Sequence, residues 1–170
     1  MSPLKVVVTG PVSAGKTTFV RGLSDEQRVE TEATTTDSTE KQTTTVGLDL
    51  GIVDIAGTRA KVFGTPGQKR FEYLRTILAE GADGFILLYP ADKSPDLDRS
   101  STFLRRQCRE MDIPVVVGIT RMDRVGDDRR LDVWDRLEPL STAMKTLDAR
   151  DRSQCLELLN QLVAAIQASP

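Results

Sequence analysis

The feature that most constrains the fold is a glycine-rich stretch near the start of the chain, GPVSAGKTT at Gly10–Thr18. It follows a β-branched run without polar alternation, Lys5–Thr9, which predicts a strand buried on both faces. It leads into Lys16–Leu23, which predicts a short helix. A G-x-x-x-x-G-K-[ST] pattern between a buried strand and a helix is typical of a loop that holds phosphate groups.

The chemistry of such a loop explains its residue types. Glycines let successive backbone N–H groups point into one concavity, and the helix N-terminus adds the positive end of its dipole. We expect Lys16 to place its charge on the β- and γ-phosphates of a nucleotide, and the Thr17 hydroxyl to ligate Mg²⁺. The other residues predicted to bind the nucleotide here are Gly10, Val12, Ser13, Ala14, Gly15 and Thr18.

The remaining pattern predicts an α/β fold. Two further buried strands are expected at Gly84–Tyr89 and Val115–Ile119, and helices at Leu97–Met111 and Ser153–Ala168. Strands that alternate with helices indicate a parallel sheet covered on both faces. We expect a single domain over residues 1–170, which is long enough to bury a core.

One segment, Thr31–Thr45, is rich in threonine and contains no apolar residue larger than alanine. Its composition is compatible with a surface loop. It is also compatible with a mobile segment that orders around a ligand. Its place after the first predicted helix favours the second interpretation.

Composition excludes several classes of function. The chain has no histidine, which removes Ser–His–Asp catalysis and most zinc sites. A net charge of −2 gives no reason to expect nucleic acid as a partner. Cys108 and Cys155 are far apart and predict small core residues in a reducing, cytoplasmic environment. No apolar run approaches a membrane span and neither end carries a lipidation motif, so we expect no direct membrane anchor.

The phosphate loop, the threonine-rich segment, TPGQ at Thr65–Gln68 and MD at Met122–Asp123 together resemble a Ras-like small GTPase over essentially the whole chain. FGTPGQ at Phe63–Gln68 and DARDR at Asp148–Arg152 resemble the bacterial gliding-motility GTPases and the actinobacterial conservon-type GTPases. The resemblance implies a P-loop NTPase fold with a six-stranded, mostly parallel sheet, one antiparallel strand and helices on both faces. It also implies a switch that binds GTP with Mg²⁺ and hydrolyses it slowly.

The resemblance assigns three residues to the γ-phosphate. Thr45 resembles the switch I threonine that ligates Mg²⁺ and contacts this phosphate, with Thr43 or Thr44 as less favoured candidates. Gly67 resembles the switch II glycine whose N–H touches it. Gln68 resembles the residue that orients the attacking water, although a solvated polar residue at a helix start would read the same way.

The resemblance also assigns a guanine site. Asp123 resembles the residue that accepts two hydrogen bonds from the base, although an acid after a strand can also be a turn residue or a helix cap. Ala149 resembles the residue whose backbone N–H meets the guanine oxygen. The remaining residues expected at this site are Thr120, Arg121, Asp148 and Arg150.

Two departures from the family pattern bear on function. The switch II aspartate that usually holds a Mg²⁺-bound water is Gly64. A two-residue hairpin turn at Ala56–Gly57 would place Asp49 directly opposite Gly64, on the same face and within reach of the metal through a water. A one-residue bulge would turn Asp49 to the other face, where it would be a solvent-facing strand residue.

The second departure is Thr120-Arg121, where an Asn-Lys pair usually begins the base-reading motif. Thr120 offers one hydroxyl in place of an amide, and Arg121 can lay its planar head over the base. The lost hydrogen bonds are worth about 1–3 kcal/mol, while Asp123 should keep the preference for guanine.

Hydrolysis is expected to need help. No arginine lies between Val29 and Ala56. Arg70 and Arg75 follow Gln68 closely enough to swing in towards the phosphates, although a surface role is favoured for both. The resemblance therefore implies a partner that raises the rate, similar to a roadblock-type dimer. Two other functions compete with a GTPase switch: a nucleotide-binding adaptor without turnover, marked by Gly64 and Thr120, and an ATP-using kinase of small metabolites, which the Gly-Gln after TP disfavours.

Overall fold

The computed structural model describes residues 2–26, 31–36, 43–67, 72–93, 102, 104–106, 110 and 112–170. Within residues 31–36 and 43–46, and at residue 72, it describes the backbone alone. The fold and the site below are built from these parts of the chain.

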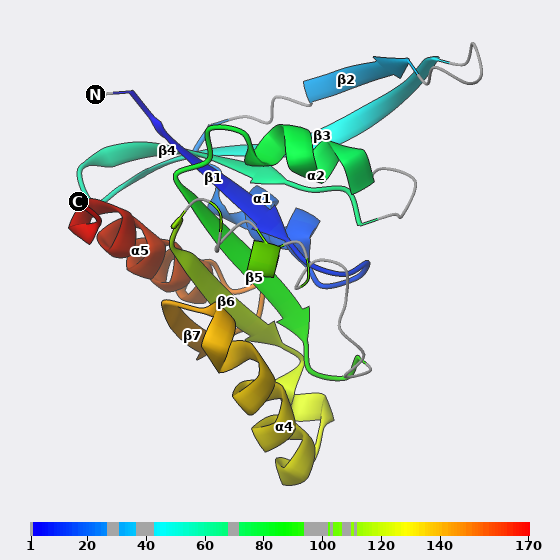
Figure 1. Cartoon of the computed structure of the whole chain (residues 1–170), viewed down its shortest axis with the longest axis vertical. Coiled ribbons are helices and arrows are strands. Elements are labelled where there is room, and N and C mark those ends of the chain that lie inside the picture. Colours follow the sequence, from blue (N-terminus) through cyan, green and yellow to red (C-terminus); the bar gives the residue numbers. More distant parts are fainter. Residues whose placement is uncertain are drawn as a thin grey trace.

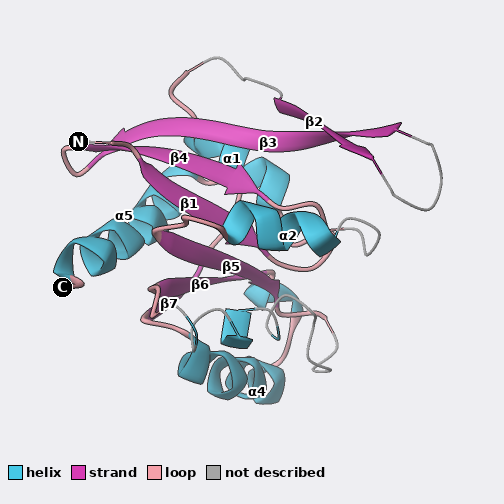
Figure 2. Cartoon of the chain, turned by 45° about the horizontal axis from the view of Figure 1, so that its top comes forward, coloured by secondary structure: helices cyan, strands magenta, loops and turns pink. Residues whose placement is uncertain are grey.

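A single sheet forms the centre of the molecule (Figure 2). In the described residues its strands follow the order β2-β3-β4-β1-β5-β6-β7. β3 runs antiparallel to both of its neighbours, and the other pairs are parallel. The strands are β1 (Leu4–Thr9), β2 (Thr31–Thr36), β3 (Thr43–Ile55), β4 (Thr58–Gly64), β5 (Gly84–Pro90), β6 (Val115–Thr120) and β7 (Ala143–Thr146).

The predicted architecture is confirmed. β3 to β7 with β1 make the expected six-stranded sheet with one antiparallel strand, and helices cover both faces (Figure 1). β2 adds a seventh strand at the edge, beyond β3. The helices are α1 (Lys16–Leu23), α2 (Glu72–Ala79), α4 (Asp127–Leu137) and α5 (Arg152–Ala168), with short 3₁₀ turns at Met122–Arg124 and Glu138–Leu140.

The buried strands divide their side chains between two cores. Val6 and Val8 of β1 face the helices α1 and α5, whereas Val7 faces α2 and α4. Every residue of β5 and of β6 is buried, as the continuous apolar runs predicted. Cys155 is buried among the first group, as expected, and Cys108 lies outside the described residues.

The threonine-rich segment differs from the surface-loop expectation, and its ordering around a ligand stays a prediction. Its two described parts are strands: Thr31–Thr36 forms β2, and Thr43–Thr45 begins β3. This hairpin projects from the body of the molecule (Figures 1 and 2). The reason is that threonine is β-branched and favours a pleated backbone even without an apolar face.

Two further expectations concern helices. The expected helix over Leu97–Met111 lies mostly outside the described residues, although 102, 104–106 and 110 are helical. Within the part of the chain that the structure describes, no helix combines the length and the apolar character needed to cross a bilayer.

The turn between β3 and β4 has the predicted form. Ala56 and Gly57 both have positive φ, 50° and 73°, as a two-residue hairpin of the favoured hand requires. Ile55 then pairs with Thr58, and the register continues without a bulge to Asp49 opposite Gly64. The predicted register is therefore confirmed.

Candidate functional site: a phosphate loop beside a base pocket

The phosphate loop connects β1 to α1 and depends on glycine at two points. Gly10 has φ 152°, and a Cβ there would lie 2.2 Å from the backbone oxygen of Leu88 on β5. Gly15 has φ 97°, and a Cβ there would lie 3.1 Å from the Cβ of Ala149. Gly10 lets the phosphate loop pass close to the backbone of β5, and Gly15 lets the loop that carries Ala149 pack against the phosphate loop.

Lys16 lies at the centre of the loop, only 8% exposed. Its Nζ donates to the backbone oxygens of Gly10 and Pro11, both at 2.7 Å. A Cβ on Gly67 would lie 3.1 Å from this Nζ and 3.0 Å from the Cα of Val12. The segment after β4 therefore passes directly over the phosphate loop, where Gly67 brings its backbone next to the lysine.

Asp49 of β3 lies across the ladder from Gly64, with its side chain beside the first turn of α1. Its Oδ2 accepts a hydrogen bond from the Thr17 hydroxyl at 2.6 Å, and its Oδ1 lies 3.4 Å from Nε of Arg21. A Cβ on Gly64 would lie 3.2 Å from the Asp49 Cβ. The carboxylate thus occupies the space beside the missing side chain, and contacts the hydroxyl predicted to ligate Mg²⁺.

These residues fit a Mg²⁺ ion. A threonine hydroxyl that ligates a cation must direct its hydrogen elsewhere, and Asp49 accepts a hydrogen bond from the Thr17 hydroxyl. Oxygen ligands and a nearby carboxylate are what Mg²⁺ prefers, together with phosphate oxygens of a substrate. Arg21 was not singled out from the sequence, although its place four residues after Thr17, one turn along the same helix, is the signal that would have found it.

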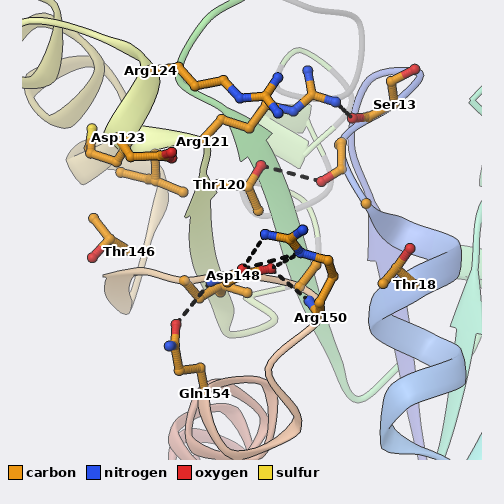
Figure 3. Close-up of a pocket in the computed structure, with 16 residues that line it drawn as sticks. Ser13, Thr18, Thr120, Arg121, Asp123, Arg124, Thr146, Asp148, Arg150 and Gln154 are labelled. Carbon is orange, nitrogen blue, oxygen red and sulfur yellow. Dashed lines mark hydrogen bonds and ion pairs between the residues drawn. The ribbon is translucent and has the colours of Figure 1, made fainter.

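A pocket of about 530 Å³ opens beside the phosphate loop (Figure 3). It lies at the carboxyl ends of the parallel strands, where α/β sheets commonly bind ligands. The predicted nucleotide-binding residues that line it are Ser13, Ala14, Gly15, Thr18, Thr120, Arg121, Asp123, Asp148, Ala149 and Arg150. The structure therefore brings the base-site residues together with one side of the phosphate loop.

The two unusual residues of the base motif contact the phosphate loop. The Thr120 hydroxyl donates to the backbone oxygen of Ala14 at 3.3 Å, and Thr120 is buried. Nη2 of Arg121 donates to the backbone oxygen of Ser13 at 2.7 Å (Figure 3). Arg121 has the left-handed values φ 58° and ψ 28°. Both residues therefore tie the end of β6 to the phosphate loop.

The turn before α5 presents its backbone to the same pocket. Asp148 accepts from the side chain and the N–H of Arg150, both at 2.9 Å, and these bonds lower the pKa of its carboxyl to about 2. The Asp148 N–H donates to Gln154, and that of Asp151 to the Asp148 oxygen. Among the described residues this turn leaves the N–H of Ala149 without a protein acceptor, as a contact to a ligand oxygen needs.

For two of the predicted site residues, Gln68 and Thr45, the structure describes no side chain. Gln68 lies outside the described residues. The backbone of Thr45 lies in β3, paired with Thr34 and four residues before Asp49, and its side chain is outside the description. Their roles stay predictions.

The expectation that Arg75 lies at the surface is wrong. Arg75 is 3% exposed in α2, next to the buried Leu74 and Leu78. Its Nε and Nη1 are buried and, among the described residues, have no hydrogen-bond acceptor. Arg75 therefore lies on the same buried face of the helix as Leu74 and Leu78.

Comparisons with known proteins agree with this geometry. Residues 2–154 match the family model described as the elongation factor Tu GTP binding domain. The uncharacterized protein MJ1339 of Methanocaldococcus jannaschii is 30% identical over 137 residues, which are 80% of each chain. The Ras-related protein Rab-18-B of Danio rerio is 27% identical over 185 residues, covering 100% of this chain and 82% of the relative.

Solved structures show the same fold at low sequence identity. The Arl6 BBS3 small GTPase from Trypanosoma brucei, with a bound nucleotide analogue, has a TM-score of 0.71 at 16% identity and covers 99% of this chain and 100% of its own. A bacterial selenocysteine-specific elongation factor, EF-Sec, also has a TM-score of 0.71, and this chain spans 29% of its length. By the extent of the family match, the chain belongs to the family of the elongation factor Tu GTP binding domain, among the P-loop GTPases.

Proposed function

We propose that this chain is a GTP-hydrolysing molecular switch that acts in a bacterial signalling or polarity pathway. The observation that carries the proposal is the 2.6 Å contact between Asp49 and Thr17. It supplies a carboxylate at the phosphate loop from the strand opposite Gly64, where the family pattern would have its acid.

In this proposal Lys16 contacts the β- and γ-phosphates, and the Thr17 and Thr45 hydroxyls hold Mg²⁺ with the help of Asp49 through a water. When bound, Mg²⁺ neutralises the charge that gathers on the phosphate oxygens. The Gly67 N–H contacts the γ-phosphate, since its backbone lies beside Lys16. Loss of that phosphate on hydrolysis would release the segment after β4, which is the basis of the switch.

Gln68 orients the attacking water in this proposal, and Lys16 stabilises the charge of the transition state. Switch I carries no arginine, so the intrinsic rate is expected to be slow. We propose that a partner resembling a roadblock-type dimer supplies or completes the missing contacts.

Guanine selectivity rests on Asp123 and on the Ala149 N–H. Asp123 lines the pocket, and the carboxylate can accept two hydrogen bonds from the base edge. The Thr120 hydroxyl donates to the backbone oxygen of Ala14, so it is not directed at the hydrogen-bonding edge of the base that Asp123 contacts in this proposal. The affinity for GTP is expected to be reduced by the missing amide, and the preference over ATP to persist.

The test is single-turnover phosphate release with Mg²⁺, with Gln68→Leu as the control. The proposal expects slow release from the wild type that Gln68→Leu abolishes. A second function, a nucleotide-binding adaptor without turnover, is favoured by Gly64 and Thr120, which depart from the family pattern. Tight GTP binding with no release above the Gln68→Leu background would establish the adaptor. A comparison of GTP with ATP by thermal shift separates both from an ATP-using kinase.

A further inference from the structure

Arg121 is held in an unfavourable backbone conformation by contacts at both ends of its guanidinium. Its φ of 58° and ψ of 28° are left-handed, a region that costs non-glycine residues energy. Nη2 donates to the Ser13 oxygen at 2.7 Å. Nη1 lies 3.4 Å from each carboxylate oxygen of Asp92. The side chain is therefore stretched between the phosphate loop and the turn after β5.

The turn that carries Asp92 is itself fastened. It spans Pro90–Lys93, and the N–H of Lys93 donates to the first carbonyl of the turn at 3.1 Å. Arg129 of α4 donates through Nε to the Ala91 oxygen at 3.0 Å and through Nη2 to the Lys93 oxygen. Asp92 thus projects from a turn whose carbonyls are bound to a helix, which makes it a fixed point for Arg121. Its Oδ2 also lies 3.7 Å from Nη1 of Arg124, a longer contact than that with Arg121.

We propose that Asp92 is a positioning residue of the nucleotide site: it holds Arg121 beside the base pocket, and so lowers the dissociation rate of guanine nucleotides. This inference rests on the proposed function, because it assumes that the pocket takes the base. Figure 3 shows Arg121 extending along the pocket towards Ser13. A guanidinium held in one orientation can cover the face of a purine without losing rotamer freedom on binding.

Charge alone predicts the opposite effect, which makes the inference testable. Asp92 is an acid near the site of a polyanion, so its carboxylate repels the phosphates. Neutralising it would tighten binding if the residue acted only through its charge. Under the proposal, neutralising Asp92 lets the Arg121 side chain move, and this side chain then loses conformational entropy each time a nucleotide binds.

The experiment measures dissociation rates and affinities of GTP, GDP and inorganic tripolyphosphate for Asp92→Asn. We expect GTP and GDP to bind about two- to fivefold more weakly, the size of a partly exposed ion pair. Tripolyphosphate has no base, so its affinity should stay unchanged or rise slightly. The matched control is Asp54→Asn, which removes a bidentate carboxylate–arginine pair, with Arg59, at the distant hairpin.

A double-mutant cycle completes the test. If Asp92 acts through Arg121, then Asp92→Asn should add nothing in an Arg121→Ala background. Unchanged or tighter GTP binding by Asp92→Asn, additive effects in the cycle, or an equal loss for tripolyphosphate would overturn the inference. Failure of the proposed function looks different, because then the wild type itself binds neither GTP nor GDP.

Discussion

Exchange of the two side chains at Asp49 and Gly64 tests whether the acid has moved across the ladder. Asp49→Asn removes the charge and keeps the shape. Asp49→Gly combined with Gly64→Asp returns the acid to the position that the family pattern gives it. The exchange is sterically open, because the Asp49 Cβ at 3.2 Å is the closest atom to a Cβ on Gly64, and the exchange removes it. The next atom, Cγ2 of Val20, lies at an ordinary 3.5 Å.

The magnitude follows from the contacts of Asp49. Its ion pair with Arg21 is half exposed and worth about 0–1 kcal/mol, and its hydrogen bond with Thr17 about 1.5–3 kcal/mol. Asp49→Asn should therefore cost about 1–3 kcal/mol of stability without ligand. Loss of a group that orients a metal's surroundings typically weakens metal affinity by about 10–100-fold. The Mg²⁺ dependence of GTP binding should weaken by that amount.

The assay is a Mg²⁺ titration of the dissociation rate of a fluorescent GTP analogue, with urea unfolding of the nucleotide-free proteins as a check on folding. Asp49→Asn should need about 10–100-fold more Mg²⁺ to slow dissociation. The exchanged variant should recover most of this loss. If Asp49→Asn folds and shows the Mg²⁺ dependence of the wild type, the acid does not serve the metal and the reasoning fails.

Four further outcomes are expected. Asp123→Ala should abolish the preference for GTP over ATP in competition binding; an unchanged preference would remove Asp123 from the base site. Gly10→Ala should lower stability in urea unfolding by about 1–3 kcal/mol or prevent folding, because its Cβ would lie 2.2 Å from a backbone oxygen; wild-type stability would contradict the loop geometry. Arg75→Met should raise stability by about 1–2 kcal/mol, since two buried N–H groups without a described acceptor are removed; a loss would mean that Arg75 has a favourable partner. Burial raises the pKa of the Cys155 thiol to about 12, whereas the thiol of the unfolded chain ionises near pH 9. The contribution of this thiol to the free energy of unfolding is therefore full below pH 9 and falls as the pH rises from 9 towards 12. Cys155→Ala should flatten that fall, and identical pH curves for the two proteins would count against a buried thiol.

The sequence was sufficient to predict the structure where a short local pattern is compatible with a single backbone geometry. The strand–glycine–helix order around Lys16 predicted the phosphate loop, and α1 has the expected bounds. Ala56–Gly57 predicted a two-residue turn, and the period of two along the strands then placed Asp49 opposite Gly64. In both cases only a few residues connect the two elements, so the backbone has little conformational freedom and the residue pattern determines the geometry.

The sequence was insufficient where the outcome depends on parts of the chain that are distant. Threonine favours a strand, but the segment has no apolar face, so the pairing of Thr31–Thr36 with β3 gave no signal in the sequence. Asp92 looks like any acid after a strand until the fold brings it to Arg121. Arg75 was expected at the surface, although Leu74 and Leu78 on the same helix already indicated a buried stripe. Partners that are far apart in the chain give no signal in one sequence.

The position of Asp49 has a mechanical consequence. In the proposed switch, Thr45 and Asp49 both lie on β3 and serve the metal, whereas Gly67, which shares the terminal phosphate with Thr45, follows β4. β3 runs as one continuous strand from Thr43 at the projecting hairpin to Ile55. A force on the hairpin end of β3 would therefore reach the backbone at Thr45 and Asp49 along one strand, without passing through the phosphate loop or the base pocket.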